Sequence, residues 1–259
     1  MTMIAPNVSP LLAKLAIDLD HGPADVLGRF FQQADAAAHG LGVTLSFADL
    51  GELIEVNAQN RDSWLPLFPT YDIRCNTIGP DDAFCIMGRD RHGKVVATHA
   101  GRLFNLKLGN FHDLAQSLRL MYEDPNGSRR PGETCVVTAK AAQSIAGSVV
   151  FSGAAWYHPD YRGKGLSRIV PILSRAYAFT HWNMDYLVAM MSEGVVRGGM
   201  TERTGYTNID WDIRVSNSPL GDVRFAFMWM EPRQLLQDVA KFVVRSEREA
   251  PDALLQRRA

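Results

Sequence analysis

The chain has 259 residues, 46% of them hydrophobic and 21% charged, which is enough for one large or two small domains with a buried core. Its 27 basic and 28 acidic residues give a formal net charge of −1, which argues against a general nucleic-acid-binding protein. The three cysteines, Cys75, Cys85 and Cys135, have no CxxC spacing. We therefore expect reduced structural thiols rather than a disulfide framework or a zinc site.

No stretch approaches the roughly 18–20 consecutive apolar residues that span a bilayer. Residues 1–20 lack the order of charged, apolar and small residues that marks a secretory signal. These two observations favour a cytoplasmic protein with no membrane contact.

The first half of the chain alternates helical and strand patterns. Helical spacing of apolar residues predicts a helix over 24–39, which Gly40 and Gly42 end. Alternation predicts a short strand near 43–47, and a second helix follows over 49–60. Two apolar runs around a turn at 90–93 predict an antiparallel hairpin over 83–103.

The middle of the chain is less regular. Asn110 is a good N-cap, and apolar spacing predicts a helix from there to about Tyr122. Residues 123–132 have loop composition, and 135–138 form a short predicted strand.

The most informative pattern covers residues 148–191. A strand at 148–157 is followed by a turn, a glycine-rich loop, an apolar helix and a buried strand at 185–191, which together predict a βαβ unit. Pro171 lies inside the predicted helix, so the helix either kinks there or starts late. Strands at 206–215 and 223–230 and a C-terminal helix from about Pro232 complete the chain.

The loop Arg162-Gly163-Lys164-Gly165 enters the helix of this unit. Helix N-termini present free backbone amides and a partial positive charge, and glycines allow phosphate to approach closely. The loop matches neither a dinucleotide-binding nor a Walker A pattern. Taken alone, such a loop is more often a tight, solvated basic turn than an anion site.

Residues 157–167 resemble the acetyl-CoA signature of the GNAT superfamily of N-acetyltransferases, whose pattern is Gln/Arg-x-x-Gly-x-Gly/Ala. Arg162 fills the first position, Gly165 the fourth, and Ser167 stands where glycine or alanine is usual. The segment 202–206 is similar to the helix-ending Glu-Lys-Leu-Gly-Phe of the family. The hairpin at 83–103 and the helix at 24–39 also match in order.

The resemblance implies a single mixed α/β domain over 1–259. Its central twisted sheet would be mostly antiparallel, with one splayed parallel strand pair and helices on its faces. A segment at 104–146 would be inserted, where the family has a short turn. Such an insertion often forms a lid or a specificity pocket.

The resemblance also implies acetyl transfer from acetyl-CoA to an amine by direct attack. The cosubstrate would be held by eight residues: Tyr157, His158, Arg162, Gly163, Lys164, Gly165, Leu166 and Ser167. Two alternatives stay open, namely a catalytically inactive CoA-binding regulatory protein and an acyltransferase that uses a longer acyl-CoA or an acyl-carrier donor. The acceptor can be a small-molecule or peptide amine.

The catalytic groups are less well defined. Thr201 occupies the place of the tyrosine that usually acts as the acid in the family, so that role does not carry over. Ser192 and Glu193 follow the strand at 185–191 and are candidates, although both can instead cap the next helix. Tyr157 is a further candidate proton donor, with a buried structural tyrosine as the alternative.

The remaining expectations concern groups outside this loop. His99 alternates with apolar residues, so we expect a core histidine rather than a base. No histidine has ligand-like spacing, and we expect no metal site. The apolar strand at 223–230 is either a core strand or an edge of a homodimer.

Overall fold

The computed structural model describes the backbone of residues 20–256 and the side chains of residues 20–248. The expectation about a secretory signal lies outside the described residues, apart from residue 20. Within the described range, no helix is both long enough and apolar enough to cross a bilayer.

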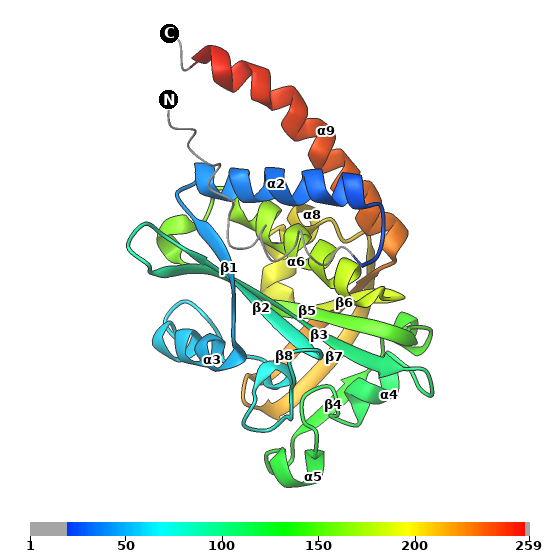
Figure 1. Ribbon diagram of the computed structural model, residues 1–259. Helices are drawn as coiled ribbons and strands as arrows, with labels where there is room; N and C mark the ends of the chain where they lie inside the picture. Colours follow the sequence, from blue (N-terminus) through cyan, green and yellow to red (C-terminus); the bar gives the residue numbers. More distant parts are fainter. Residues whose placement is uncertain (1–19, 257–259) are drawn as a thin grey trace.

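An eight-stranded mixed sheet forms the centre of the molecule, in the order β1-β2-β3-β5-β6-β8-β7-β4 (Figure 1). Every neighbouring pair is antiparallel except β5 and β6. The strands are β1 (Thr44–Ala48), β2 (Ala83–Arg89), β3 (Val95–Leu106), β4 (Thr134–Val137), β5 (Gly147–Tyr157), β6 (Tyr186–Ser192), β7 (Asn208–Ser218) and β8 (Gly221–Met230). The predicted fold class, mixed α/β with one parallel strand pair, is confirmed.

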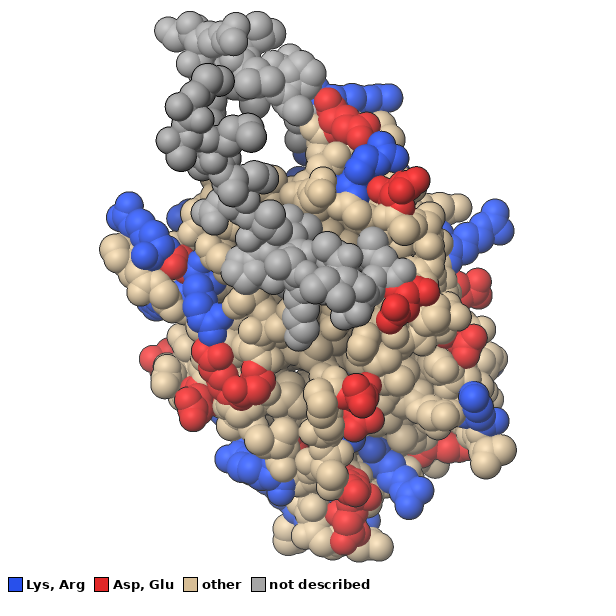
Figure 2. All heavy atoms as spheres, in the orientation of Figure 1, with Lys and Arg blue, Asp and Glu red and all other residues tan. Residues whose placement is uncertain are grey.

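Helices cover both faces of this sheet. Their bounds are α2 (Ala24–Gly40), α3 (Leu50–Gln59), α4 (Phe111–Gln116), α5 (Pro125–Ser128), α6 (Leu166–Trp182), α7 (Glu193–Arg197), α8 (Met200–Thr204) and α9 (Pro232–Gln256). Figure 1 shows α2 and α6 on one face, with α9 running past α2, and α3 and α4 on the other side. Charged side chains of both signs are interspersed over the face in Figure 2.

Two hydrophobic cores lie on the two faces of the sheet. The first core, under α2, α6 and α9, includes Phe30, Phe31 and Leu173. The second core, on the opposite face, includes Phe111, Phe151 and other buried residues. Both cores use side chains of the same central strands, so the sheet is buried on both faces.

Helix α6 connects the parallel strands β5 and β6, which confirms the predicted βαβ unit. The helix begins at Leu166 and runs through Pro171 to Trp182, so a late start is excluded. Nearly every residue after the first turn is buried. This packing compensates for the backbone hydrogen bond that Pro171 cannot donate.

Strands β5 and β6 pair only at their beginnings. Val149 to Phe151 pair with Tyr186 to Val188, and beyond that point the strands separate. Each strand then stays with its other neighbour, as Tyr157 pairs with Ala97 and Ser192 pairs with Phe225. A bulge near Ala154, whose φ is 51°, bends β5 where the separation begins. The predicted splay of the parallel pair is therefore present.

Three expectations need correction or can now be decided. Helix α4 ends at Gln116 rather than near Tyr122, because Leu118 takes a φ of 64° and the following apolar residues turn into the second core.

The segment 104–146 supplies β4, which pairs with β7, and none of its residues lines the cavity described below. It therefore forms an extension of the sheet and not a lid. Strand β8 lies between β6 and β7, so it is a core strand.

Among the described residues, neither the cysteines nor the other potential metal ligands form a disulfide or a metal-binding cluster. All three cysteines are free thiols, and burial raises the pKa of Cys135 to about 12. No group of three His, Cys, Asp or Glu side chains among these residues could hold a metal ion.

Candidate functional site

A cavity of about 420 Å³ opens where β5 and β6 separate. Its walls come from the end of β5, the end of β6, helix α6 and the segment 63–71. Most of the lining is apolar, including Phe68, Phe151 and Phe225. The cavity reaches both faces of the sheet, because it contacts second-core residues such as Phe68 and also Arg175 of α6.

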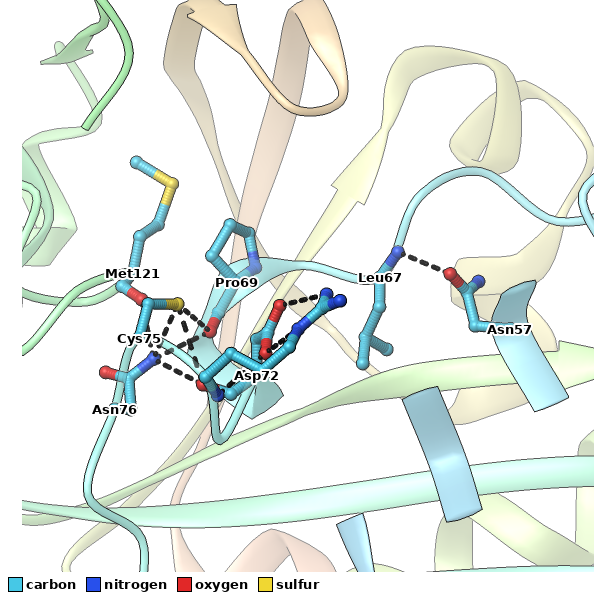
Figure 3. A network of polar contacts seen from close by, with 8 residues as sticks. Asn57, Leu67, Pro69, Asp72, Cys75, Asn76 and Met121 are labelled. Atoms are coloured by element: carbon cyan, nitrogen blue, oxygen red, sulfur yellow. Dashed lines mark hydrogen bonds and ion pairs between the residues drawn. The ribbon is translucent and has the colours of Figure 1, made fainter. Parts of the chain in front are cut away.

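The segment 63–71 forms a fixed wall over this cavity, and side chains hold it in place (Figure 3). The Asn57 side chain donates to Leu65 O at 2.8 Å and accepts from Leu67 N at 2.9 Å. The Asn76 amide donates to Pro69 O at 2.8 Å. Since these partners are backbone atoms, the asparagines fix the path of the chain itself.

Two stacked tryptophans close the wall against β5. The rings of Trp64 and Trp156 lie 5.3 Å apart at an angle of 10°. Trp156 Nε1 donates to Ser63 Oγ at 3.1 Å. The buried Tyr71 hydroxyl lies 2.9 Å from Phe151 O. The wall is therefore tied to the sheet by stacking and by hydrogen bonds.

The glycine loop lies beside the cavity, at the N-terminus of α6. Gly163 and Gly165 have φ of 76° and 98°, conformations that favour glycine. Gly165 is the N-cap of α6 and makes no side-chain cap hydrogen bond, so the first amides of the helix keep their donor capacity. Leu166 is buried in the first core, whereas Ser167 is partly exposed.

Charged residues around the loop have protein partners. Arg162 is exposed and donates to Tyr157 O at 3.1 Å and Ser63 O at 3.0 Å, which links the loop to the cavity wall. The Lys164 ammonium lies 4.8 Å from the centre of the Tyr161 ring. His158 lies 2.8 Å from Lys94 Nζ, and its Nδ1 accepts from Asp160 N. His158 thus caps the turn before the loop.

The three catalytic candidates occupy different environments. Ser192 ends β6 and lines the cavity, and it makes no cap hydrogen bond to α7. Glu193 pairs with Arg197 at 2.6 Å and lies outside the cavity lining. Tyr157 lines the cavity, and its buried hydroxyl has no hydrogen-bond partner. Burial raises the pKa of Tyr157, so this hydroxyl stays protonated at neutral pH.

A polar cluster that the sequence did not single out lies on the α6 side of the cavity. Arg175 is 3% exposed and Tyr206 is 6% exposed. Burial and the Arg175 charge lower the pKa of His99 to about 3, and His99 Nδ1 lies 2.8 Å from Ser174 Oγ. His99 is therefore a neutral, hydrogen-bonded core histidine, as expected.

The Tyr206 hydroxyl also lies in this cluster without a hydrogen bond of ordinary geometry. Burial raises its pKa, and the nearby Arg175 and Ser152 oppose that rise. The helix-ending motif that residues 202–206 resemble has phenylalanine at the position of Tyr206. Such a motif predicts a buried ring there and gives no sign of a buried hydroxyl.

No protein-family model matches the sequence, and no curated protein matches it significantly. Among solved structures, the chain is similar to a mutant of spermidine N-acetyltransferase from Vibrio cholerae, with 12% identity, 76% of this chain and 97% of that chain covered, and a TM-score of 0.43. The same enzyme in complex with CoA and spermine gives 13% identity, coverages of 76% and 99%, and a TM-score of 0.41. At such TM-scores, the assignment of the fold rests on the sheet itself, with its parallel pair and its splay.

The fold is GNAT-like.

Thr201 and the tyrosines of the cavity occupy different environments. Thr201 is buried in α8, donates to Glu202 at 3.0 Å, and does not line the cavity. Tyr157 and Tyr206, in contrast, both line the cavity. The third tyrosine of the cavity lining, Tyr71, instead donates its hydroxyl to Phe151 O.

Proposed function

We propose that the chain is a CoA-dependent N-acyltransferase, most simply one that transfers an acetyl group from acetyl-CoA to an amine. The observation that carries the proposal is the position of the cavity. It opens in the splay of the parallel strands, next to a glycine loop that begins α6. The loop that would hold the phosphates of CoA and the gap that would admit its extended pantetheine arm therefore lie side by side.

The residues present fit a CoA thioester. The amides from Gly163 to Ser167 would hold the pyrophosphate, with Arg162 and Lys164 adding positive charge. Beyond Phe151 and Val188, the facing edges of β5 and β6 make no ladder hydrogen bonds to each other. Their free backbone groups could therefore form hydrogen bonds with the amides of the extended pantetheine arm of CoA. The thioester, when bound, supplies the activated acyl carbon.

The chain must then move protons around that carbon. The amine nitrogen forms a bond to the acyl carbon and gives up a proton to a base or to water, the carbon–sulfur bond breaks, and the thiolate takes up a proton. Tyr157 is the proton donor favoured by this geometry, because its protonated hydroxyl faces the cavity without a partner. Ser192, at the opposite strand end, remains a candidate to position the acceptor. Glu193 loses this role, since Arg197 holds it outside the cavity lining.

A charge reversal at the start of α6 tests the donor site. In Ser167→Glu, the new carboxylate would repel the pyrophosphate, although an acid in the first helical turn should not harm the helix. Acetyl-CoA should raise the melting temperature of the wild type and of the neutral control Ser167→Gln, and raise it far less in Ser167→Glu. Gly165 is unsuitable for this test, because its φ of 98° strains any other side chain.

The outcomes separate the alternatives. No stabilisation of the wild type by acetyl-CoA or by longer thioesters would contradict the proposal. Stabilisation without release of free thiol across a panel of small-molecule and peptide amines would indicate the CoA-binding regulatory protein. Stronger stabilisation by longer thioesters would favour the longer donor. The oligomeric state, including a homodimer, is a separate question for light scattering.

A further inference from the structure

Arg175 is a buried cation whose charge has no counterion in the described residues. Its Nε donates to Pro171 O at 3.1 Å, its NH1 lies 3.8 Å from Met230 Sδ, and its guanidinium stands 5.2 Å from the centre of the Tyr206 ring. A guanidinium has five N–H donors. Among the described residues, its oxygen partners are Pro171 O and the uncharged Tyr206 hydroxyl, and neither carries a negative charge.

The side chains around Arg175 supply hydrogen-bond donors but no negatively charged group. Tyr157 places a buried, unpartnered hydroxyl at this cavity, and the buried Tyr206 hydroxyl lies beside Arg175 and Ser152. Arg175 is close enough for its charge to influence both tyrosines. No aspartate or glutamate of residues 20–248 lines this cavity. His99 is neutral, so the cluster carries one positive charge.

Such an excess of donors is costly unless a ligand supplies the acceptor. Burying an unpaired charge costs several kcal/mol, which an anion bound in hydrogen-bond contact would offset. One guanidinium with flanking hydroxyls suits a carboxylate, which is planar and carries a single negative charge. A phosphate dianion would bring two charges to one cation in a mostly apolar cavity.

The position within the cavity is compatible with a reacting molecule. Arg175 lies nine residues after Leu166 on α6, which corresponds to about 13 Å along the helix from the glycine loop. The cluster is therefore separated from the loop that would hold phosphate, and it lies on the same cavity as Tyr157. A group bound here would be far from the pyrophosphate and near the proposed proton donor.

We propose that Arg175 and Tyr206 form a carboxylate subsite beside Tyr157, so that one of the two substrates carries a free carboxylate. The carboxylate belongs either to the acyl group, as in a dicarboxylic acyl thioester, or to the acceptor, as in an amino acid. The role of the ligand as a substrate rests on the proposed acyltransferase function, but the anion site itself does not.

Two matched pairs of ligands distinguish these sources. Succinyl-CoA and butyryl-CoA have acyl chains of equal length and differ in a terminal carboxylate. Alanine and alaninamide differ in the carboxylate of the acceptor. Binding of each compound should be measured by calorimetry, with CoA present for the second pair. We expect the wild type to prefer the carboxylate member of one pair by about tenfold or more, as for other charge-assisted hydrogen bonds.

Matched variants connect this preference to Arg175. Arg175→Met should abolish it and leave the affinity for CoA unchanged, whereas the same substitution at Arg119, which is exposed and outside the cavity lining, should change neither. Arg175→Lys should retain part of the preference, because lysine keeps the positive charge but lacks the planar guanidinium that can bind both carboxylate oxygens. If Arg175→Met does not fold, Tyr206→Phe removes one hydroxyl only and should weaken the preference.

The absence of a preference in both pairs, or a preference that persists in Arg175→Met and in Tyr206→Phe, would overturn the subsite. If no thioester binds but alanine is still preferred over alaninamide, the acyltransferase proposal fails and the subsite stands. If thioesters bind without any carboxylate preference, only the subsite fails.

Discussion

At the scale of single residues, Asp212 on β7 shows how a buried carboxylate is stabilised when its partners come from the chain itself. Its side chain is 3% exposed, accepts from Thr138 Oγ1, and pairs with Arg224 and Arg214. The Thr138 hydrogen bond and the two guanidinium groups hold the pKa of Asp212 well below its usual range. Arg175 has the opposite charge and no such partners.

We expect Asp212→Asn to lower the free energy of unfolding at pH 7 by about 1–3 kcal/mol, because the arginines lose an anionic acceptor. The folded state depresses this pKa, so the carboxylate contributes stability above the pKa of the unfolded chain, about 4. That contribution is lost as the pH falls below this value. Urea unfolding at pH 7 and pH 3 should therefore show a smaller difference between wild type and variant at pH 3. The exposed Asp62→Asn is the control, and a difference independent of pH would contradict the assignment.

Whether a residue of the site could be predicted depends on how close in the sequence its structural determinants lie. The glycine loop could be predicted, because Gly163 and Gly165 lie between a strand pattern and a helix pattern that are contiguous in sequence. Arg175 could not be predicted. An arginine in a helix is ordinarily exposed, and the burial of Arg175 depends on Met230 and Tyr206, which later segments of the chain bring to it.

At the scale of elements, periodicity predicted the βαβ unit and the hairpin, but not the end of α4. Leu118 and Met121 have helical spacing, yet they are buried by turns that follow Gln116. A buried irregular turn and a helix can present the same apolar spacing, so composition alone does not separate them. The segment 63–71 was also unassigned, because its conformation depends on side chains such as Asn57 that bond to backbone atoms.

This segment provides a prediction at the same scale. Asn57→Ala removes the acceptor of Leu67 N and the donor to Leu65 O, which we expect to loosen the cavity wall and to lower stability by about 1–3 kcal/mol. Hydrogen exchange should show faster exchange at Leu67, while amides within β3 keep their protection relative to global stability. Gln59→Ala, at an exposed position of the same helix, is the control. Unchanged exchange at Leu67 would mean that the tryptophan stack, Asn76 and Tyr71 hold the wall without Asn57.

At the scale of the whole molecule, the two cores share one sheet. Val150 and Leu187 face the first core, while Val149 and Val188, their neighbours on the same strands, face the second. If the helices on either face of the sheet were lost, one face of the central strands would be exposed to water. The helices on the opposite face pack against these same strands and would be destabilised as well. The single domain predicted from the sequence should therefore unfold as one unit.

Leu173→Ala tests this coupling from the first core. Leu173 is fully buried on α6, so we expect a loss of about 2–5 kcal/mol. The background should carry Trp182→Phe, because the other four tryptophans lie outside the first core. Tryptophan fluorescence then reports from beyond that core, and far-ultraviolet circular dichroism reports on all helices and strands. Both probes should show one transition, displaced equally by Leu173→Ala. A fluorescence transition that stays in place while the dichroism transition moves would mean that the second core, with the stacked Trp64 and Trp156 at the cavity, is stable without the first.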